Sequence, residues 1–189
     1  MQKRWKAVLT LTLTTFAFSV ILNLGSNSVL SYLPLTLSIL LLFFIILIGV
    51  VFDVLGVAAT AGEESPFHAM ASNRLFGAKE AIWLVRNADR VSTFCNDLVG
   101  DVAGTLSGAV GAAIIFRLST RAAGVGEALA TTMMVAFIAA VTVGGKAIGK
   151  GFAISNSTSI LLAAGKVLHS LERIGLRVHL TTEKNKKRS

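Results

Sequence analysis

The sequence predicts an all-α integral membrane protein. Four transmembrane helices are expected, with a pair of short cytoplasmic helices and a C-terminal amphipathic helix that lies along the membrane like a belt. Of the 189 residues, 53% are hydrophobic and 15% are charged, whereas about 25% of the residues of a soluble domain are charged. No charged residue stands between Lys6 and Asp53. Apolar runs of about 20 residues, the length that crosses a bilayer, recur along the chain.

The first two spans occupy the N-terminal third of the chain. The first is expected from about Lys6 to Leu24, after a basic N-terminus. A cleavable signal peptide has a similar pattern, but no small-x-small cleavage site follows here, so an uncleaved helix is favoured. The turn-forming cluster Gly25–Ser28 is predicted to end this helix. The second span is expected over about Ser31–Val57, with Pro34 tolerated in its first turn.

A polar segment, from about Thr60 to Asp89, follows the second span. It is predicted to hold two short helices. The first begins at Ser65, a suitable N-cap with proline directly after it. The second covers Ala78–Arg86, and the residues from Asn73 to Gly77 separate the two.

The remaining spans are expected over about Arg90–Phe116 and Glu127–Ile148. Beyond them, Asn156 or Ser157 can begin a helix with apolar residues on one face and basic and polar residues on the other. Such a helix suits the membrane surface. The predicted units are an additional N-terminal transmembrane helix (1–28), a three-span core with the short helices and the belt helix (29–176), and a basic cytoplasmic tail (177–189).

The formal net charge is +8, and the basic residues lie at span ends and in the tail. Topology and attraction to anionic lipid account for this charge, so the expected partner is the lipid bilayer and nucleic acid is not expected. Lysine and arginine near the N-terminus place it in the cytoplasm. With four spans, the polar segment and the C-terminus are cytoplasmic too. The predicted location is the cell membrane, as a multi-pass protein.

Four ionisable residues lie in stretches that are otherwise apolar: Asp53, Asp97, Asp101 and Lys146. A charge at the bilayer centre costs about 2.5–3.5 kcal/mol on insertion scales, so such residues face a bundle interior, pair with each other or bind an ion. Asp97 is expected at the cytoplasmic interface, and Asp101 lies one turn deeper. Asp53 is either an interfacial carboxylate in contact with water or an ion ligand.

Oxygen ligands dominate the candidate site residues. Magnesium and calcium prefer carboxylate, amide, hydroxyl and carbonyl oxygens. Asp53, Asn96, Asp101 and Ser107 supply such a set and are the candidate metal ligands, with Mg²⁺ as the ion that is bound or transported. The sequence has no cysteine or histidine cluster for zinc, no phosphate loop and no hydrolase motif. We therefore do not expect an enzyme.

Glycine recurs at every fourth position of the third span, at Gly100, Gly104 and Gly108. This small-xxx-small pattern lets helix backbones approach closely. It predicts close helix contacts, and a two-fold homodimer is one arrangement that would use them.

Three stretches of the sequence, taken together in their order and spacing, are similar to the motifs of a known family. They are Phe67–Ala71 through Gly77–Lys79, Asn87–Arg90 into Leu98–Asp101, and Gly145–Ala153. Together with the amphipathic helix that follows, they resemble the transmembrane domain of the cyclin M/CorB (CorC) family of magnesium transporters. The stretches are similar to that family's cytoplasmic helix with its Gly-Ala pair, its entry into the second core helix, and its Gly-Glu-x-x-Pro-Lys run. The resemblance covers about residues 48–176.

The resemblance implies a position for the ion site. In that family the site uses serine hydroxyls from the first core helix, an asparagine from the second and a glutamate from the third. On this chain, Asp53 falls near the serines, Asp101 or Asn96 at the asparagine, and Lys146 at the glutamate. The lysine would place a tethered ammonium in the cation site, with Asp53 or Asp101 as its partner.

The implied function is transport or efflux of a divalent, magnesium-type cation by a minimal, divergent CorB-like membrane domain, with a homodimer as the expected assembly. Lys146 leaves a second hypothesis open, namely a non-transporting assembly or regulatory subunit in which this lysine fills a degenerate ion site. A third is that the Lys146–aspartate pair couples transport to protons or sodium. The nucleotide-binding pair and C-terminal domain that often follow in the family are not in this sequence, so regulation through them is expected to be absent or supplied by a separate cytoplasmic protein.

Overall fold

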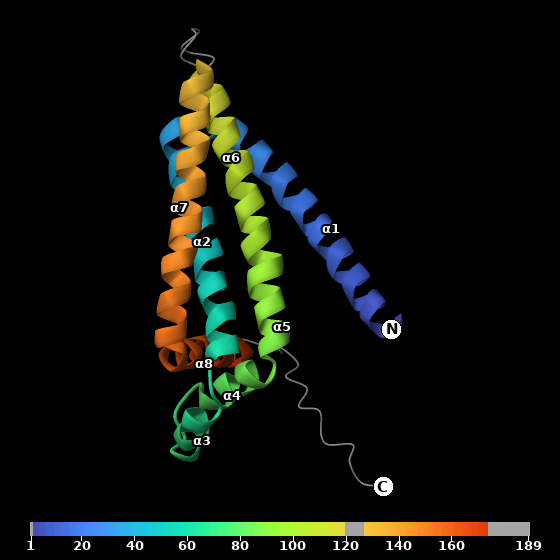
Figure 1. Cartoon of the computed structure of the whole chain (residues 1–189), viewed down its shortest axis with the longest axis vertical. Coiled ribbons are helices and arrows are strands. Elements are labelled where there is room, and N and C mark those ends of the chain that lie inside the picture. Colours follow the sequence, from blue (N-terminus) through green and yellow to red (C-terminus); the bar gives the residue numbers. More distant parts are fainter. Residues whose placement is uncertain (1, 120–126, 174–189) are drawn as a thin grey trace.

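The structure is a computed structural model that describes residues 2–119 and 127–173, and in these residues every regular element is a helix (Figure 1). Four helical segments are long and apolar enough to cross a membrane: Leu9–Ser26, Leu35–Ala61, Ala88–Leu118 and Val135–Ser155. The predicted fold class is therefore confirmed, and the fold fits a multi-pass membrane protein. The predicted basic tail (177–189) lies outside the described residues.

The long elements are α1 (Gln2–Tyr32), α2 (Leu35–Ala61) and α7 (Glu127–Ser155). The third span is one continuous rod in Figure 1, built from α5 (Ala88–Ser92), a π-helix η1 (Thr93–Gly100) and α6 (Asp101–Ser119). The short elements are α3 (Ser65–Ser72), α4 (Ala78–Arg86) and the belt helix α8 (Ser157–Arg173).

Helix α2 is the centre of the bundle. It contacts α5, η1, α6 and α7 along its length, and its lower end meets α8. Helix α1 leans away from the other spans, as Figure 1 shows, and it contacts α6. Helix α8 lies across the lower ends of α2 and α7, with α3 and α4 beneath it. The N-terminal end of α1 lies toward this same end of the molecule.

Two clusters of buried apolar side chains hold these helices together. One joins α2 to the third span along their length and includes Leu42, Ile45, Val110 and Ile114. The other joins the lower end of α2 to the short helices and α8, and it includes Phe67, Leu84 and Leu161. The second cluster fixes the lower end of the bundle, where the candidate site lies.

Helix α1 is longer than the sequence predicts. The cluster Gly25–Ser28 was expected to end it, but the helix continues to Tyr32. The hydroxyl of Ser28 donates to the carbonyl oxygen of Leu24 at 3.0 Å, so this side chain is satisfied within the helix itself, whereas Oγ of Ser26 is buried without a hydrogen-bond partner among the described residues. The break comes at Pro34, because proline lacks an N–H group and disfavours helical geometry in the residue before it.

The two short helices match their prediction closely. Helix α3 begins at Ser65 with proline in its first turn, and α4 has the predicted bounds Ala78–Arg86. Arg74 and Gly77 turn the chain between them with positive φ angles of 56° and 86°. Glycine adopts such a conformation without a steric penalty, which explains its place directly before α4.

Helices α4 and α8 cross with their backbones in contact. A Cβ atom at Gly165 would lie 2.2 Å from the carbonyl oxygen of Gly77, and one at Gly77 would lie 2.5 Å from the backbone nitrogen of Lys166. Beside the crossing, Nδ1 of His169 lies 2.7 Å from a carboxylate oxygen of the buried Glu80. This crossing determines how α8 lies beneath the spans.

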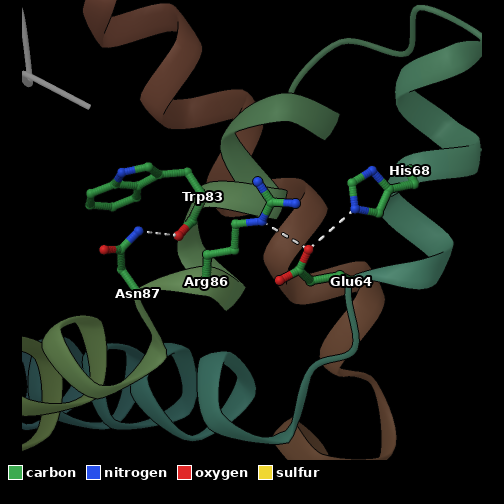
Figure 2. Close-up of polar contacts among 5 residues, drawn as sticks. All are labelled: Glu64, His68, Trp83, Arg86 and Asn87. Atoms are coloured by element: carbon green, nitrogen blue, oxygen red, sulfur yellow. Dashed lines mark hydrogen bonds and ion pairs between the residues drawn. The ribbon is translucent and has the colours of Figure 1, made fainter. Parts of the chain in front are cut away.

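A polar clasp ties the start of α3 to the end of α4 (Figure 2). Nε of Arg86 donates to a carboxylate oxygen of Glu64 at 2.9 Å, and Nε2 of His68 lies 3.2 Å from the same oxygen. The Arg86 hydrogen bond, followed by that of His68, lowers the pKa of Glu64 below its ordinary value of 4.5. The clasp is therefore strongest when Glu64 is ionised.

Substitution of Gly165 by alanine is expected to destabilise the fold by about 1–3 kcal/mol, as overpacking does elsewhere. The added Cβ would overlap the Gly77 carbonyl. Thermal unfolding in detergent, followed by circular dichroism, measures the effect. The control is Gly151→Ala on α7, where a Cβ meets no atom within 4 Å and alanine is the better helix former. Equal losses of Tm in both variants would contradict the crossing.

Glu64 should make stability depend on pH on the acid side. Because its pKa is lowered in the folded state, its contribution is present above the ordinary value of 4.5 and is lost as the pH falls through the folded pKa. Glu64→Gln should therefore lose less Tm than the wild type on acidification, and Glu63→Gln at the exposed neighbouring position should behave like the wild type. An unchanged acid-side loss of Tm in Glu64→Gln would show that the clasp adds no stability.

Candidate functional site

Asp53 is buried in the lower half of α2, with 4% of the residue exposed. It shares a helix face with Gly49 and Gly56, three or four residues away on either side. A Cβ at Gly49 would lie 3.0 Å from the Cβ of Ala103, so the third span approaches α2 closely here. The two glycines bring the helices together around Asp53. Of the two alternatives that the sequence left open, the interfacial carboxylate in contact with water does not fit this burial.

Asn96 lies against α2 one turn below Asp53. A Cβ at Gly56 would fall 2.0 Å from Oδ1 of Asn96, so the amide occupies the space that the glycine leaves. Nδ2 of Asn96 donates to the hydroxyl of Ser92 at 3.2 Å. Asn96 belongs to the π-helix η1, and π-helical turns occur frequently at functional sites.

Gly100 ends the π-helix and brings two charged groups to one place. Nζ of Lys146 donates to the carbonyl oxygen of Gly100 at 3.3 Å. A Cβ at Gly100 would lie 3.6 Å from this Nζ and 3.9 Å from Oδ1 of Asp53. The missing side chain therefore leaves room for an ammonium from α7 and a carboxylate from α2 at the same point of the third span.

Lys150 is a site residue that the sequence reasoning missed. Its Nζ lies 3.9 Å from Oδ2 of Asp53, and its side chain is 54% exposed. Lys146 and Lys150 are four residues apart on α7 and share a face, which is the signal that could have identified the pair. Between them, a Cβ at Gly149 would lie 2.7 Å from a methyl group of Val54. This close approach places both lysines beside α2.

Two oxygen atoms of the site are buried without a hydrogen-bond partner among the described residues: Oδ2 of Asp53 and Oδ1 of Asn96. Buried polar atoms are almost always hydrogen-bonded, so each such atom needs an explanation, for example a bound ion or water. In the described part of the chain, the formal charges that meet here are one carboxylate and two ammonium groups. The site offers oxygen ligands, but its net charge is positive.

The other predicted ligands lie apart from this arrangement. The side chain of Asp101 is exposed although Gly100 precedes it, and that of Asp97 is exposed as well. Ser107 is buried, but its hydroxyl donates to the carbonyl oxygen of Gly104 at 2.9 Å. Over residues 2–119 and 127–173, no three histidine, cysteine or acidic side chains are close enough to hold a metal ion together.

The glycine stripe of the third span makes few of the expected close contacts. A Cβ at Gly104 or Gly108 would meet no atom within 4 Å. Both residues line a groove of about 260 Å³ between α6 and α7, together with Ser107 and Thr142. Within the described chain, glycines of α2 and α7 contribute to the close approach of the spans, and on α6 a Cβ at Gly111 would lie 2.7 Å from Ile138 of α7.

Comparison of this chain with protein-family models, with curated proteins and with solved structures found no match. The CorB-like resemblance therefore stays a prediction from the order and spacing of motifs, and the function is argued below from the site.

Removal of the Asp53 carboxylate should destabilise the bundle, because it removes the ion-pair partner of Lys150 and the negative charge near the ammonium of Lys146. The loss for Asp53→Asn is expected to be smaller than the about 3–5 kcal/mol of a fully buried pair, because Lys150 is half-exposed. Lys146→Met should be neutral or stabilising, since Asp53 keeps Lys150. Chemical unfolding in detergent measures both, with the exposed Asp89→Asn on α5 as control. If Asp53→Asn unfolds like Asp89→Asn, the carboxylate does not hold the site together.

Proposed function

We propose that the protein is a multi-pass membrane protein that transports a cation through the polar site between α2, η1 and α7. The observation that carries the proposal is the pair of buried oxygens without hydrogen-bond partners, on Asp53 and Asn96, at the contact of α2 with η1. Ionisable residues within spans typically mark ion pathways. Carboxylate and amide oxygens are hard ligands of the kind that such ions use.

The surrounding framework supports this proposal. The site lies at the lower end of the bundle, where α8, α3 and α4 pack against the spans (Figure 1). The CorB-like resemblance implies a magnesium-type divalent cation, so Mg²⁺ is the first substrate to test. A homodimer and a separate cytoplasmic regulatory protein are the partners that the sequence predicts.

A second function is favoured by the two lysines. Lys146 donates a hydrogen bond to the Gly100 carbonyl oxygen, and Lys150 forms an ion pair with Asp53. The two lysine ammonium groups thus interact with oxygen atoms that a bound cation would use as ligands. This arrangement supports a non-transporting assembly or regulatory subunit, in which the lysines fill a degenerate ion site permanently.

Flux into liposomes distinguishes the two functions. Purified protein is reconstituted, and entry of Mg²⁺, Na⁺ and K⁺ is followed with ion-sensitive dyes enclosed in the vesicles. Transport predicts entry of at least one of these ions, reduced at least tenfold in Asp53→Asn. The exposed Asp89→Asn is the matched control and should keep the wild-type rate.

The non-transporting alternative predicts a different result. None of the three ions would then enter vesicles that contain the wild type or Lys146→Met, although both proteins elute as folded protein in detergent. That outcome would reject the transport proposal and leave the lysine-filled site as a structural feature.

A further inference from the structure

The two lysines of the site are held differently. Lys146 is fixed, because its Nζ donates to the Gly100 carbonyl inside the bundle. Lys150 is held loosely, since its Nζ lies 3.9 Å from Asp53, beyond hydrogen-bond distance, and its side chain is 54% exposed. Lys150 can therefore leave Asp53 more readily than Lys146 can leave the Gly100 carbonyl, so Lys146 keeps its charge at the site.

The fixed ammonium determines which ions the oxygens can accept. With Lys150 withdrawn, the charges of Asp53 and Lys146 cancel. An incoming ion then gains little net Coulomb energy from this pair and still has to give up water. The cost of taking an ion out of water increases with the square of its charge, so a divalent ion loses about four times as much as a monovalent ion of equal size.

The oxygen ligands that the site offers also disfavour a divalent ion. Mg²⁺ is dehydrated reluctantly and binds through one or two carboxylates, usually with further anionic groups. Here the described residues offer one carboxylate, which already pairs with Lys150 and lies near the ammonium of Lys146. The side chains of Asp97 and Asp101 are exposed and lie apart from it. The residues therefore do not fit the divalent ion that the CorB-like resemblance implies.

We propose that this site selects a monovalent alkali cation over Mg²⁺, with Lys146 as the fixed charge that excludes divalent ions. The inference rests on the proposed function, in that a cation must enter the site between α2, η1 and α7. Lys146 is thus a specificity-determining residue, and Asp53 and Asn96 supply the oxygen ligands. Lys150 is the group that the entering ion displaces.

Equilibrium binding to the full chain in detergent tests the selection. Radioactive Na⁺ is bound at constant ionic strength with a large organic cation as the supporting salt, and unlabelled Na⁺, K⁺ or Mg²⁺ is added as competitor. In the wild type, Mg²⁺ should need at least a tenfold higher concentration than Na⁺ to displace the label. Lys146→Gln should reduce this preference at least tenfold, and Lys146→Met, which keeps an unbranched but apolar side chain, should do the same.

Lys79→Gln is the matched control, because it removes an exposed lysine from α4, outside the spans, and should leave the preference unchanged. Competition by Mg²⁺ as strong as that by Na⁺ in the wild type would overturn the selection while leaving cation transport intact. A preference that survives both Lys146 variants would also overturn it. If the folded wild type and variants bind none of the three ions, both the selection and the transport proposal fail.

Discussion

The rest of the site depends on one constraint: the carboxylate of Asp53 is buried inside the spanning bundle and therefore needs a positive charge nearby. A lone charge in a low-dielectric interior is far less stable than one paired with an opposite charge. The structure meets the constraint with Lys150 at 3.9 Å from the carboxylate and with Lys146 at the neighbouring Gly100 carbonyl. Helix α7 must therefore lie beside α2 in one register, with both lysines on the facing side.

Glycine makes this register sterically accessible. Gly49 and Gly56 let the third span approach α2, and Gly149 lets α7 approach it from another side. Gly100 leaves the space in which the ammonium and the carboxylate meet. Small residues at helix contacts are the usual means by which spans pack without a hydrophobic driving force between them. Here they also bury the carboxylate of Asp53, so the packing and the chemistry of the site have the same origin.

Hydropathy was enough to predict the four spans, because crossing a bilayer imposes length and apolarity on any helix. The short helices were predictable from local turn chemistry, as at Gly77. The predicted end of α1 was wrong by several residues, since the helix continues through Gly25–Ser28 to Tyr32, where Pro34 follows shortly after. The π-helix has no sequence period that reveals it, and the exposure of Asp101 after it was therefore not predicted. Lys150 was missed because its pairing depends on how α7 and α2 are aligned in space.

The central claim is that Lys146 and Asp53 act on each other within one site. A double-mutant cycle with Asp53→Asn, Lys146→Met and the combined variant tests it most directly, with the free energy of unfolding in detergent as the readout. The account predicts a coupling energy above about 0.5 kcal/mol, with the combined variant more stable than Asp53→Asn alone. Effects that add within about 0.3 kcal/mol would contradict it, because independent sites behave in that way.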